Sequence, residues 1–436
     1  MIAPDNQKQN RAGLLEWLVG ELATRGNCYS VSAPSNFGKS FFLRRLAAKS
    51  SPALLFAYID LNLRADDTAQ SFYELILREL LSLPSLEGNT RLKESYSQVL
   101  DISGNPFLVA RAFLTGLQAA LQTASPRLIL VLDELDKPLS LLPGQIFLHL
   151  RALRDRYPEK LCYVCGTRVS LPAYGRDDEG IAEFYELFEN GGIIRLKGLN
   201  LTELRGIMPA GLALNPDSLY DLSGGHPGLA AKVIRVALES GTEEALLTTL
   251  KAAPEIRREC QRLWESLPEG EQKALLQWLE GVKSLTVTPY LGNLEERGLV
   301  RQLEEHPVIF SQLFAQFLTE KLEEIAAPTS SFKEIAYDPH RDEVIFDGGI
   351  RRLTLSGNAV LLFRYLYLRQ SKPWCTKDEL ISAVWGNAAY SSENLDKLVS
   401  DLRQELGDTE KKIIRTIPRK GLLMVGVREW VSRNSE

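Results

Sequence analysis

Residues 31–46, VSAPSNFGKSFFLRRL, carry the side chains that are best suited to hold a phosphate group. An apolar, strand-like segment is followed by a short loop and then by an apolar period typical of a helix, which is the context of a phosphate-binding loop. Alanine replaces glycine at the first loop position, and we expect this to be tolerated if φ there stays below zero. The predicted nucleotide-binding residues of the loop are Ala33, Pro34, Ser35, Asn36, Phe37, Gly38, Lys39 and Ser40.

Each residue type at the end of this loop has a distinct chemical use. Gly38 lets the backbone turn tightly, so that successive N–H groups point at phosphate oxygens. Lys39 would reach the β- and γ-phosphates, and the Ser40 hydroxyl would ligate Mg²⁺. The positive end of the following helix favours the same anion. The loop therefore predicts ATP and Mg²⁺ as cofactors.

A second stretch, LILVLDELD at residues 128–136, ends an apolar strand in two carboxylates. In a doubly wound sheet the carboxyl ends of the strands meet at the ligand-binding edge, beside the phosphate-binding loop. Asp133 would hold Mg²⁺ through water, and Glu134 would orient and deprotonate the attacking water. An acidic, solvated turn would explain this stretch taken alone. Together with Gly38, Lys39 and Ser40 it predicts an ATPase.

Five apolar runs alternate with helical periodicity between residues 10 and about 240, which predicts a parallel sheet with helices on both faces. The runs are nearly continuous in apolarity, as strands buried on both faces require. They are residues 28–33, 53–62, 127–136, 160–167 and 192–199. Cys162 and Cys165 lie in the fourth run and are interpreted as core residues, because no further metal-ligand pair accompanies them.

The composition sets limits on class and partners. The chain has 436 residues, a formal net charge of −5 and five scattered cysteines, which fits a multidomain protein of a reducing cytoplasm. No global positive field gathers nucleic acid, so any such contact needs a local basic patch. No apolar run approaches the roughly 20 residues that span a bilayer, and the start lacks an apolar signal region. We therefore expect a cytoplasmic protein without a membrane partner.

The segments APSNFGKSFFLRRL, LILVLDELDKPL, YVCGTR and LSGGHPGLAAKVI have the order and spacing of one branch of P-loop ATPases. Over residues 10–325 the chain resembles the STAND and origin-recognition-type branch of the AAA+-like ATPases. The resemblance implies that Arg168 senses the γ-phosphate, as a catalytic residue beside Glu134 and Lys39. It also implies that His226 contacts the nucleotide from a helical lid. From the residues alone, Arg168 could equally be a surface charge and His226 a neighbour of a helix N-cap.

Residues 255–325 turn helical, and LGNLEERGLV predicts a helix, a turn at Gly298 and a strand, the shape of a winged helix. The resembled family carries such a module after its lid. Glutamates at positions 295, 296, 304 and 305 favour packing on the ATPase over contact with DNA. An arginine finger is not assigned, and Arg176 and Arg195 are candidates only.

The carboxyl-terminal segment opens with strands and a predicted Gly-Gly turn at 348–349, followed by three helices and a basic hairpin. LTLSGNAVLLFRYL, ELISAVWG, LVSDLRQEL and IIRTIPRKGL resemble the effector domain of OmpR/PhoB-type regulators. In that family the third helix enters the major groove and the wing contacts the adjacent minor groove and backbone. The candidate DNA-binding residues are Lys397, Arg403, Arg415, Arg419 and Lys420. In the resembled family the arginine at position 403 often braces the helix internally.

Acidic side chains at Glu393, Asp396 and Asp401 oppose phosphate contacts by the third helix. The domain could instead bind a protein, or its own ATPase, through the same scaffold.

The predicted fold class is an α/β P-loop NTPase followed by a helical lid and two winged-helix domains. The expected domains are a P-loop ATPase core at 1–200, a helical lid at 201–254, a middle winged helix at 255–325, a linker at 326–334 and a carboxyl-terminal winged helix at 335–436.

Three functional hypotheses follow. The first is an ATP-switched regulator that binds DNA. The second is a STAND-type signalling or defence ATPase with a protein trigger or effector. The third is an ATPase of transposition or replication that loads on DNA. Assembly into a homo-oligomer stays open in each.

Overall fold

The computed structural model describes residues 10–429 except 103, 124–126, 172–177, 213, 241–248, 251–252, 280–287, 304–305, 327–334, 347–350, 371, 373, 387–390, 409–410, 412 and 418–419. The chain divides into two compact units, Met1–Thr319 and Glu320–Glu436. The finer division into five domains remains a prediction.

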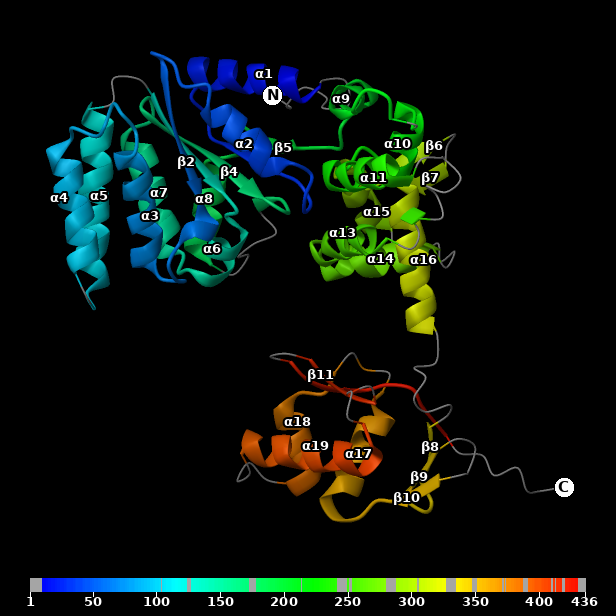
Figure 1. The fold of residues 1–436 in the computed structure, drawn as a ribbon. Coiled ribbons are helices and arrows are strands. Elements are labelled where there is room, and N and C mark those ends of the chain that lie inside the picture. Colours follow the sequence, from blue (N-terminus) through cyan, green and yellow to red (C-terminus); the bar gives the residue numbers. More distant parts are fainter. Residues whose placement is uncertain are drawn as a thin grey trace. The chain divides into compact units, whose positions relative to one another are not determined.

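The first unit is built on a five-stranded parallel sheet with the order β2-β3-β4-β1-β5 (Figure 1). Its strands are β1 (Tyr29–Ser32), β2 (Leu54–Asp60), β3 (Arg127–Asp133), β4 (Leu161–Thr167) and β5 (Ile193–Arg195). All five predicted strands are confirmed. Every residue of β1 and β4 is buried, because helices cover the sheet and these strands contact side chains on both sides.

The helices lie on both faces of this sheet, as the P-loop NTPase fold requires. The chain crosses from β1 to β2 in one direction and returns through β3 and β4 in the other. Right-handed crossovers therefore put α2 on one face and α3, α5, α7 and α8 on the other. The helices are α1 (Arg11–Thr24), α2 (Lys39–Ala47), α3 (Ala69–Leu81), α4 (Thr90–Asp101), α5 (Pro106–Thr123), α6 (Asp136–Leu141), α7 (Gln145–Arg156) and α8 (Glu179–Glu186).

The strand order brings the two predicted motifs to one edge. β4 lies between β1 and β3, and Ser32 at the end of β1 is opposite Thr167 at the end of β4. A Cβ atom on Gly166 would lie 2.6 Å from Leu43 Cδ1 and 2.8 Å from Asp133 Oδ1. Only glycine therefore lets the end of β4 lie this close to α2 and β3. Cys162 and Cys165 are buried in the same strand, as predicted for core residues.

A helical region follows the sheet in the first unit. It begins with α9 (Leu201–Ile207), α10 (Pro216–Ser223) and α11 (Pro227–Ser240), where a lid is predicted. It continues with α13 (Pro254–Glu265), α14 (Glu269–Leu279), α15 (Thr288–Glu296), the antiparallel pair β6 (Val300–Leu303) and β7 (His306–Ile309), and α16 (Gln312–Ala326). Gly298, with φ of 73°, makes the predicted turn from helix to strand.

The second unit contains a four-stranded sheet, three helices and a two-stranded wing. The sheet has the order β10-β9-β8-β13 and the wing pairs β11 with β12. The elements are β8 (Ile335–Asp338), β9 (Glu343–Phe346), β10 (Arg351–Thr354), α17 (Gly357–Leu368), α18 (Lys377–Trp385), α19 (Ser392–Leu406), β11 (Ile414–Ile417), β12 (Gly421–Met424) and β13 (Val427–Glu429). This arrangement confirms the predicted carboxyl-terminal winged helix. The predicted turn at 348–349 and the body of the linker lie outside the described residues.

Across the described ranges, no helix combines the length and the apolarity that crossing a membrane needs.

We predict that Gly166→Ala lowers the free energy of unfolding of the first unit by about 1–3 kcal/mol, the usual cost of overpacking a tight core. The added methyl must displace Leu43 or Asp133. Gly20→Ala in α1 is the matched control, because a Cβ there meets nothing within 4 Å. Urea unfolding should show a gain or no change for the control. Equal midpoints for Gly166→Ala and the wild type would contradict the close approach of β3, β4 and α2.

Candidate functional site

The loop after β1 has the backbone that phosphate binding requires. Gly38, with φ of 79°, caps α2, which begins at Lys39. Ala33 is buried, and its N–H donates to the Thr167 carbonyl at 3.1 Å. The only non-glycine loop residue with positive φ is Asn36, at 57°. Ala33 therefore meets the condition under which alanine can replace the first glycine.

The Lys39 side chain is the electrostatic centre of the site. It is only 5% exposed, and its Nζ lies 3.0 Å from Glu134 Oε1. The same atom lies 3.8 Å from Asp133 Oδ1 and 3.9 Å from Asp136 Oδ2. The lysine of the loop and the carboxylates after β3 thus come together, as the motifs predict, with Asp136 as an additional neighbour.

Glu134 lies between two cations. Its second oxygen, Oε2, is 3.4 Å from Arg168 Nη2. Burial alone would raise the pKa of Glu134, but the charges and hydrogen bonds of Lys39 and Arg168 outweigh it, so the pKa lies below its ordinary value. Glu134 is therefore an ionised carboxylate at neutral pH. Its φ of 57° places it in the left-handed region directly after the strand.

Asp133 is fully buried below Glu134 and Lys39. The Tyr58 hydroxyl donates to its Oδ2 at 2.7 Å, and the Glu134 N–H donates to its Oδ1 at 2.9 Å. Burial, together with the bond to Asp133, raises the pKa of Tyr58, so that this hydroxyl remains a donor. These bonds fix the orientation of the Asp133 carboxylate.

The oxygen side chains of Ser40 and Asp133 fit Mg²⁺, a hard cation that prefers oxygen ligands. The described residues contain no cluster of three or more metal-ligating side chains. A Mg²⁺ ion bound with a nucleotide needs only one or two protein ligands, because phosphates and water supply the others. The donor set is therefore compatible with this ion.

A cavity of about 500 Å³ lies over the loop. It is lined by loop residues, by Glu134 and Arg168, and by Pro227 and Gly228 from the start of α11. This volume lies in the usual range of small-molecule sites. The predicted residues that line it are Ala33, Pro34, Ser35, Asn36, Gly38, Lys39, Ser40, Glu134 and Arg168.

Phe37 and His226 do not line this cavity, and His226 instead contacts the backbone of the loop. The His226 Nε2–H donates to the Ser35 carbonyl at 3.0 Å, and its Nδ1 accepts from the Leu229 N–H at 3.0 Å. The Phe37 ring packs edge-on against the imidazole, with 4.7 Å between centroids. Burial lowers the pKa of His226 to about 4, against the attraction of Glu259. His226 is thus a neutral side chain that positions the loop in this structure.

Further contacts hold the loop from residues that the sequence analysis did not single out. The Asn36 side chain donates to Glu259 Oε1 at 2.7 Å, and the Ser35 N–H donates to Ser266 Oγ at 3.2 Å. From the other side, Arg11 Nη2 donates to the Phe37 carbonyl at 2.7 Å. The contacts join residues 26 to 231 positions apart, so no local pattern could indicate them. Asp136 was visible in the DELD motif.

The helical region also contacts the loop that carries Arg168. Arg297, after α15, donates from Nη2 to the Arg168 carbonyl at 3.1 Å and forms a buried ion pair with Glu271. Arg195, a candidate finger, pairs with Glu296 at 2.8 Å. These contacts pack the 255–325 segment on the core of the first unit. The glutamates of this segment favour such packing over contact with DNA. Arg176 lies outside the described residues.

The candidate DNA-binding residues of the second unit have different surroundings. Lys397 on α19 and Arg415 on β11 are exposed. The Lys420 ammonium lies 4.3 Å from the centre of the Trp374 ring. Arg403 donates to the Ile414 carbonyl at 3.0 and 2.6 Å and to Thr416 Oγ1 at 2.9 Å, so it braces α19 against the wing. Arg419 lies outside the described residues.

The exposed face of α19 is acidic. Glu393, Asp396 and Asp401 are exposed, and Asp396 Oδ2 accepts from Lys377 Nζ at 2.7 Å. One of the three carboxylates is thus partly neutralised by α18. The wing, rather than α19, carries the larger share of the exposed positive charge.

Comparisons with known proteins found one matching family and several solved structures with a similar fold. Residues 351–424 match the family described as transcriptional regulatory protein, C terminal. Over the amino-terminal region the chain is similar in structure to a Walker-type ATPase of Pyrococcus abyssi, at 15% identity, covering 73% of this chain and 98% of that chain with a TM-score of 0.46. It is also similar to the ORC1 protein of Aeropyrum pernix in complex with DNA, at 15% identity. This match covers 74% of this chain and 94% of that chain, with a TM-score of 0.34.

A third similar structure is the DNA-binding domain of Escherichia coli CadC, at 24% identity. This match covers 21% of this chain and 86% of that chain, with a TM-score of 0.19. No curated protein matches the chain.

The low pKa of His226 predicts a specific loss of stability in acid. Between its unfolded pKa near 6.5 and its folded pKa of about 4, only the unfolded state binds the proton, so stability falls as the pH falls. We expect the wild type to lose about 2 kcal/mol more than His226→Gln between about pH 7 and pH 5. Denaturant unfolding at a series of pH values measures this difference.

His149→Gln is the control, because burial also lowers the pKa of His149, which is only half-buried. His149→Gln should change the pH dependence of the free energy of unfolding less than His226→Gln does. Parallel pH profiles for the wild type and His226→Gln would show that His226 takes up its proton in the folded state.

Proposed function

We propose that this protein is an ATP-binding switch that hydrolyses ATP slowly and controls DNA binding by its carboxyl-terminal winged helix. The observation that carries the proposal is the group of Lys39, Glu134 and Arg168 at the rim of a cavity closed by the phosphate-binding loop. The family match over residues 351–424 supports the DNA-binding end of the switch. The five cysteines are buried thiols outside any disulfide, which suits a reducing, cytoplasmic location.

Nucleotide binding would exchange the partners of Lys39. Its ammonium now neutralises carboxylates, and phosphate oxygens entering the cavity would compete for it. The N–H groups at the start of α2 and the positive end of that helix would hold the same oxygens. Ser40 and Asp133 would hold Mg²⁺, which neutralises charge on the β- and γ-phosphates.

Once Lys39 turns to phosphate, Glu134 Oε1 loses its partner and can accept a proton from water. Arg168 still faces Oε2 and lies at the cavity rim, where it could also meet the γ-phosphate. Arg168 would still favour the ionised form of Glu134 and so make this carboxylate a weaker base, which is why we expect slow turnover. The contacts of His226, Glu259 and Ser266 with the loop would carry the change in occupancy to the helical region.

At the other end of the switch, α19 would enter the major groove and the wing would contact the backbone. Lys397, Arg415 and Lys420 would supply phosphate contacts, with Arg419 beside them in the sequence. Arg403 would act through the position of α19, because its guanidinium is already bonded to the wing.

The alternative is a STAND-type signalling or defence ATPase whose winged helix binds a protein partner. The acidic exposed face of α19, at Glu393, Asp396 and Asp401, favours this alternative, since carboxylates repel phosphate. A protein trigger belongs to this alternative. An ATPase of transposition or replication that loads on DNA is a separate, third hypothesis, and assembly into a homo-oligomer is compatible with each.

We predict that Lys39→Ala abolishes ATP binding, because it removes the cation that faces the β- and γ-phosphates. Equilibrium binding of a fluorescent ATP analogue to the purified chain measures this. Lys49→Ala is a matched control, since that lysine is partly exposed and its ion pair among the described residues is with Glu16 at the surface. Undiminished ATP binding by Lys39→Ala would refute the assignment of the loop.

We predict that Glu134→Gln retains ATP and slows hydrolysis by about 100-fold or more, the usual effect of losing a general base. Phosphate release with Mg²⁺ under single-turnover conditions separates chemistry from binding. If the wild type does not hydrolyse ATP at all, the protein is a binding switch and not an enzyme.

We predict that reversing the charges of Arg415, Arg419 and Lys420 together flattens the dependence of log K on log salt by about 2–3 units, the contribution of three phosphates. Fluorescence anisotropy with duplex DNA at several salt concentrations measures the slope. Asp396→Asn with Asp401→Asn should tighten non-specific binding by relieving repulsion. Arg403→Ala is expected to lower stability rather than to change the slope.

The two hypotheses differ in this experiment. If neither the reversal nor the neutralisation alters DNA binding by folded protein, the winged helix binds a protein partner.

A further inference from the structure

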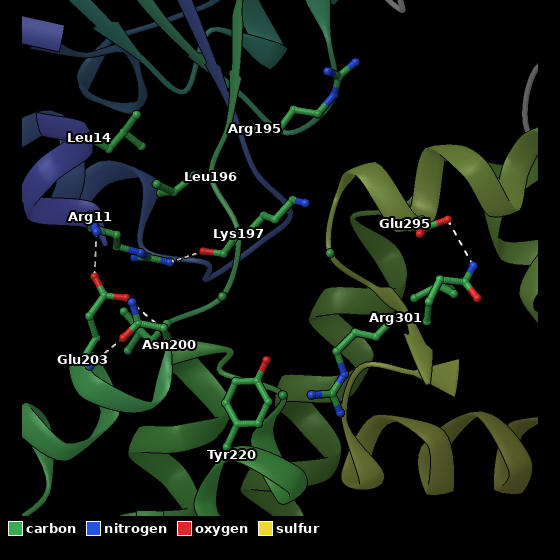
Figure 2. Close-up of a pocket in the computed structure, with 16 residues that line it drawn as sticks. Arg11, Leu14, Arg195, Leu196, Lys197, Asn200, Glu203, Tyr220, Glu295 and Arg301 are labelled. Atoms are coloured by element: carbon green, nitrogen blue, oxygen red, sulfur yellow. Dashed lines mark hydrogen bonds between the residues drawn. The ribbon is translucent and has the colours of Figure 1, made fainter. Parts of the chain in front are cut away.

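A second cavity, of about 540 Å³, lies where three parts of the first unit meet (Figure 2). Arg11 and Leu14 come from α1, and residues 195–200 from the chain after β5. Tyr220 comes from α10, and Val300 and Arg301 from β6. This volume is typical of pockets that enclose a small organic molecule.

The second cavity is separate from the nucleotide cavity. The two have no lining residue in common. Arg11 lies between them, because its Nη2 donates at 2.7 Å both to the Phe37 carbonyl of the phosphate-binding loop and to the Lys197 carbonyl (Figure 2). A molecule in the second cavity would therefore contact Arg11 without occupying the nucleotide site.

The charges that line this cavity favour an anion. Four cationic side chains, Arg11, Arg195, Lys197 and Arg301, line it together with two carboxylates, Glu203 and Glu295, and with Glu296, which pairs with Arg195, included the formal charge is +1. Glu203 accepts from the Arg11 and Asn200 N–H groups, and Arg195 pairs with Glu296.

Lys197 and Arg301 are the cations that remain available. Within the described part of the chain, neither has a carboxylate partner, and the Arg301 guanidinium lies 4.9 Å from the centre of the Tyr220 ring. In Figure 2 the two side chains come from opposite sides of the hollow, Lys197 from the chain after β5 and Arg301 from β6. An anionic group of charge −2 between them would match both, since an ammonium and a guanidinium each donate to phosphate oxygens.

The same cavity offers surface for an organic body. Tyr220 is partly exposed at this cavity beside Arg301, and Leu14, Leu196 and Val300, which are almost fully buried, form the apolar part of its wall. An aromatic or other flat group can lie against the tyrosine while the charged group faces the cations.

We propose that this cavity binds a small phosphate monoester with an aromatic or apolar body, as an effector that is distinct from the nucleotide. Because its walls come from the core, from α10 and from β6, an occupied cavity holds the helical region against the core. Arg11 then links this effector to the backbone of the phosphate-binding loop.

Phenyl phosphate is the probe, because it carries both the dianionic group and an aromatic ring. Titration calorimetry is carried out with the full chain, both as the wild type and as Lys39→Met, in which the nucleotide cavity has lost its buried lysine and keeps Arg168. We expect saturable binding in both proteins, weakened about 10-fold by Lys197→Gln or Arg301→Gln, as expected for losing one charge-assisted bond. Inorganic phosphate should bind more weakly, because it does not use the tyrosine.

Lys93→Gln, an exposed lysine of α4, is the matched control and should leave the affinity unchanged. Thermal unfolding without the probe verifies that each variant is folded. Absence of phenyl phosphate binding by the wild type overturns the proposal, and so does equal binding by Lys197→Gln, Arg301→Gln and the control. The outcome does not depend on whether the chain binds ATP, since Lys197 and Arg301 line the second cavity and not the first.

Discussion

The buried ammonium of Lys39 among carboxylates is the interaction on which the rest of the first unit depends. A cation that is 5% exposed is stable only when compensating charges surround it, and Asp133, Glu134 and Asp136 provide them. Removing one member of a buried pair typically costs about 3–5 kcal/mol. The end of β3, the start of α2 and Gly166 between them are therefore fixed together. An anionic ligand, such as the phosphate groups proposed above, could replace those carboxylates without leaving the lysine uncompensated.

The site is also supported by residues far from the sheet. His226, Glu259 and Ser266 hold the loop backbone and Asn36, while Arg297 holds the carbonyl of Arg168. A continuous series of contacts thus runs from the buried Glu271–Arg297 pair through Arg168 to Glu134 and Lys39. In the proposed switch, these contacts would carry a change at the nucleotide toward α14 and α15. Through these contacts the helical region could respond when the proposed nucleotide cavity is occupied.

The sequence predicts well what local chemistry decides. The five strands, the loop and the pair Asp133–Glu134 are visible because apolar runs and turn residues lie within short windows. Arg11, Glu259 and Ser266 are not visible, because their contacts with the loop depend on how distant helices pack. The same limit applies to His226, which was expected at the nucleotide and lies bonded to the loop backbone. Conversely, Arg403 has the bracing position that the family resemblance implies.

The positive φ of Glu134 places a limit on how stable this chain can become. A non-glycine residue in the left-handed region costs about 1–2 kcal/mol, and glycine at position 134 would relieve that strain. The same substitution would remove the carboxylate that faces Lys39 and Arg168. Because that carboxylate compensates the buried Lys39, its loss would cost more than the strain that glycine relieves. A laboratory selection for heat resistance should therefore keep glutamate at position 134, and the ion pair with Lys39 holds this residue in an unfavourable backbone conformation.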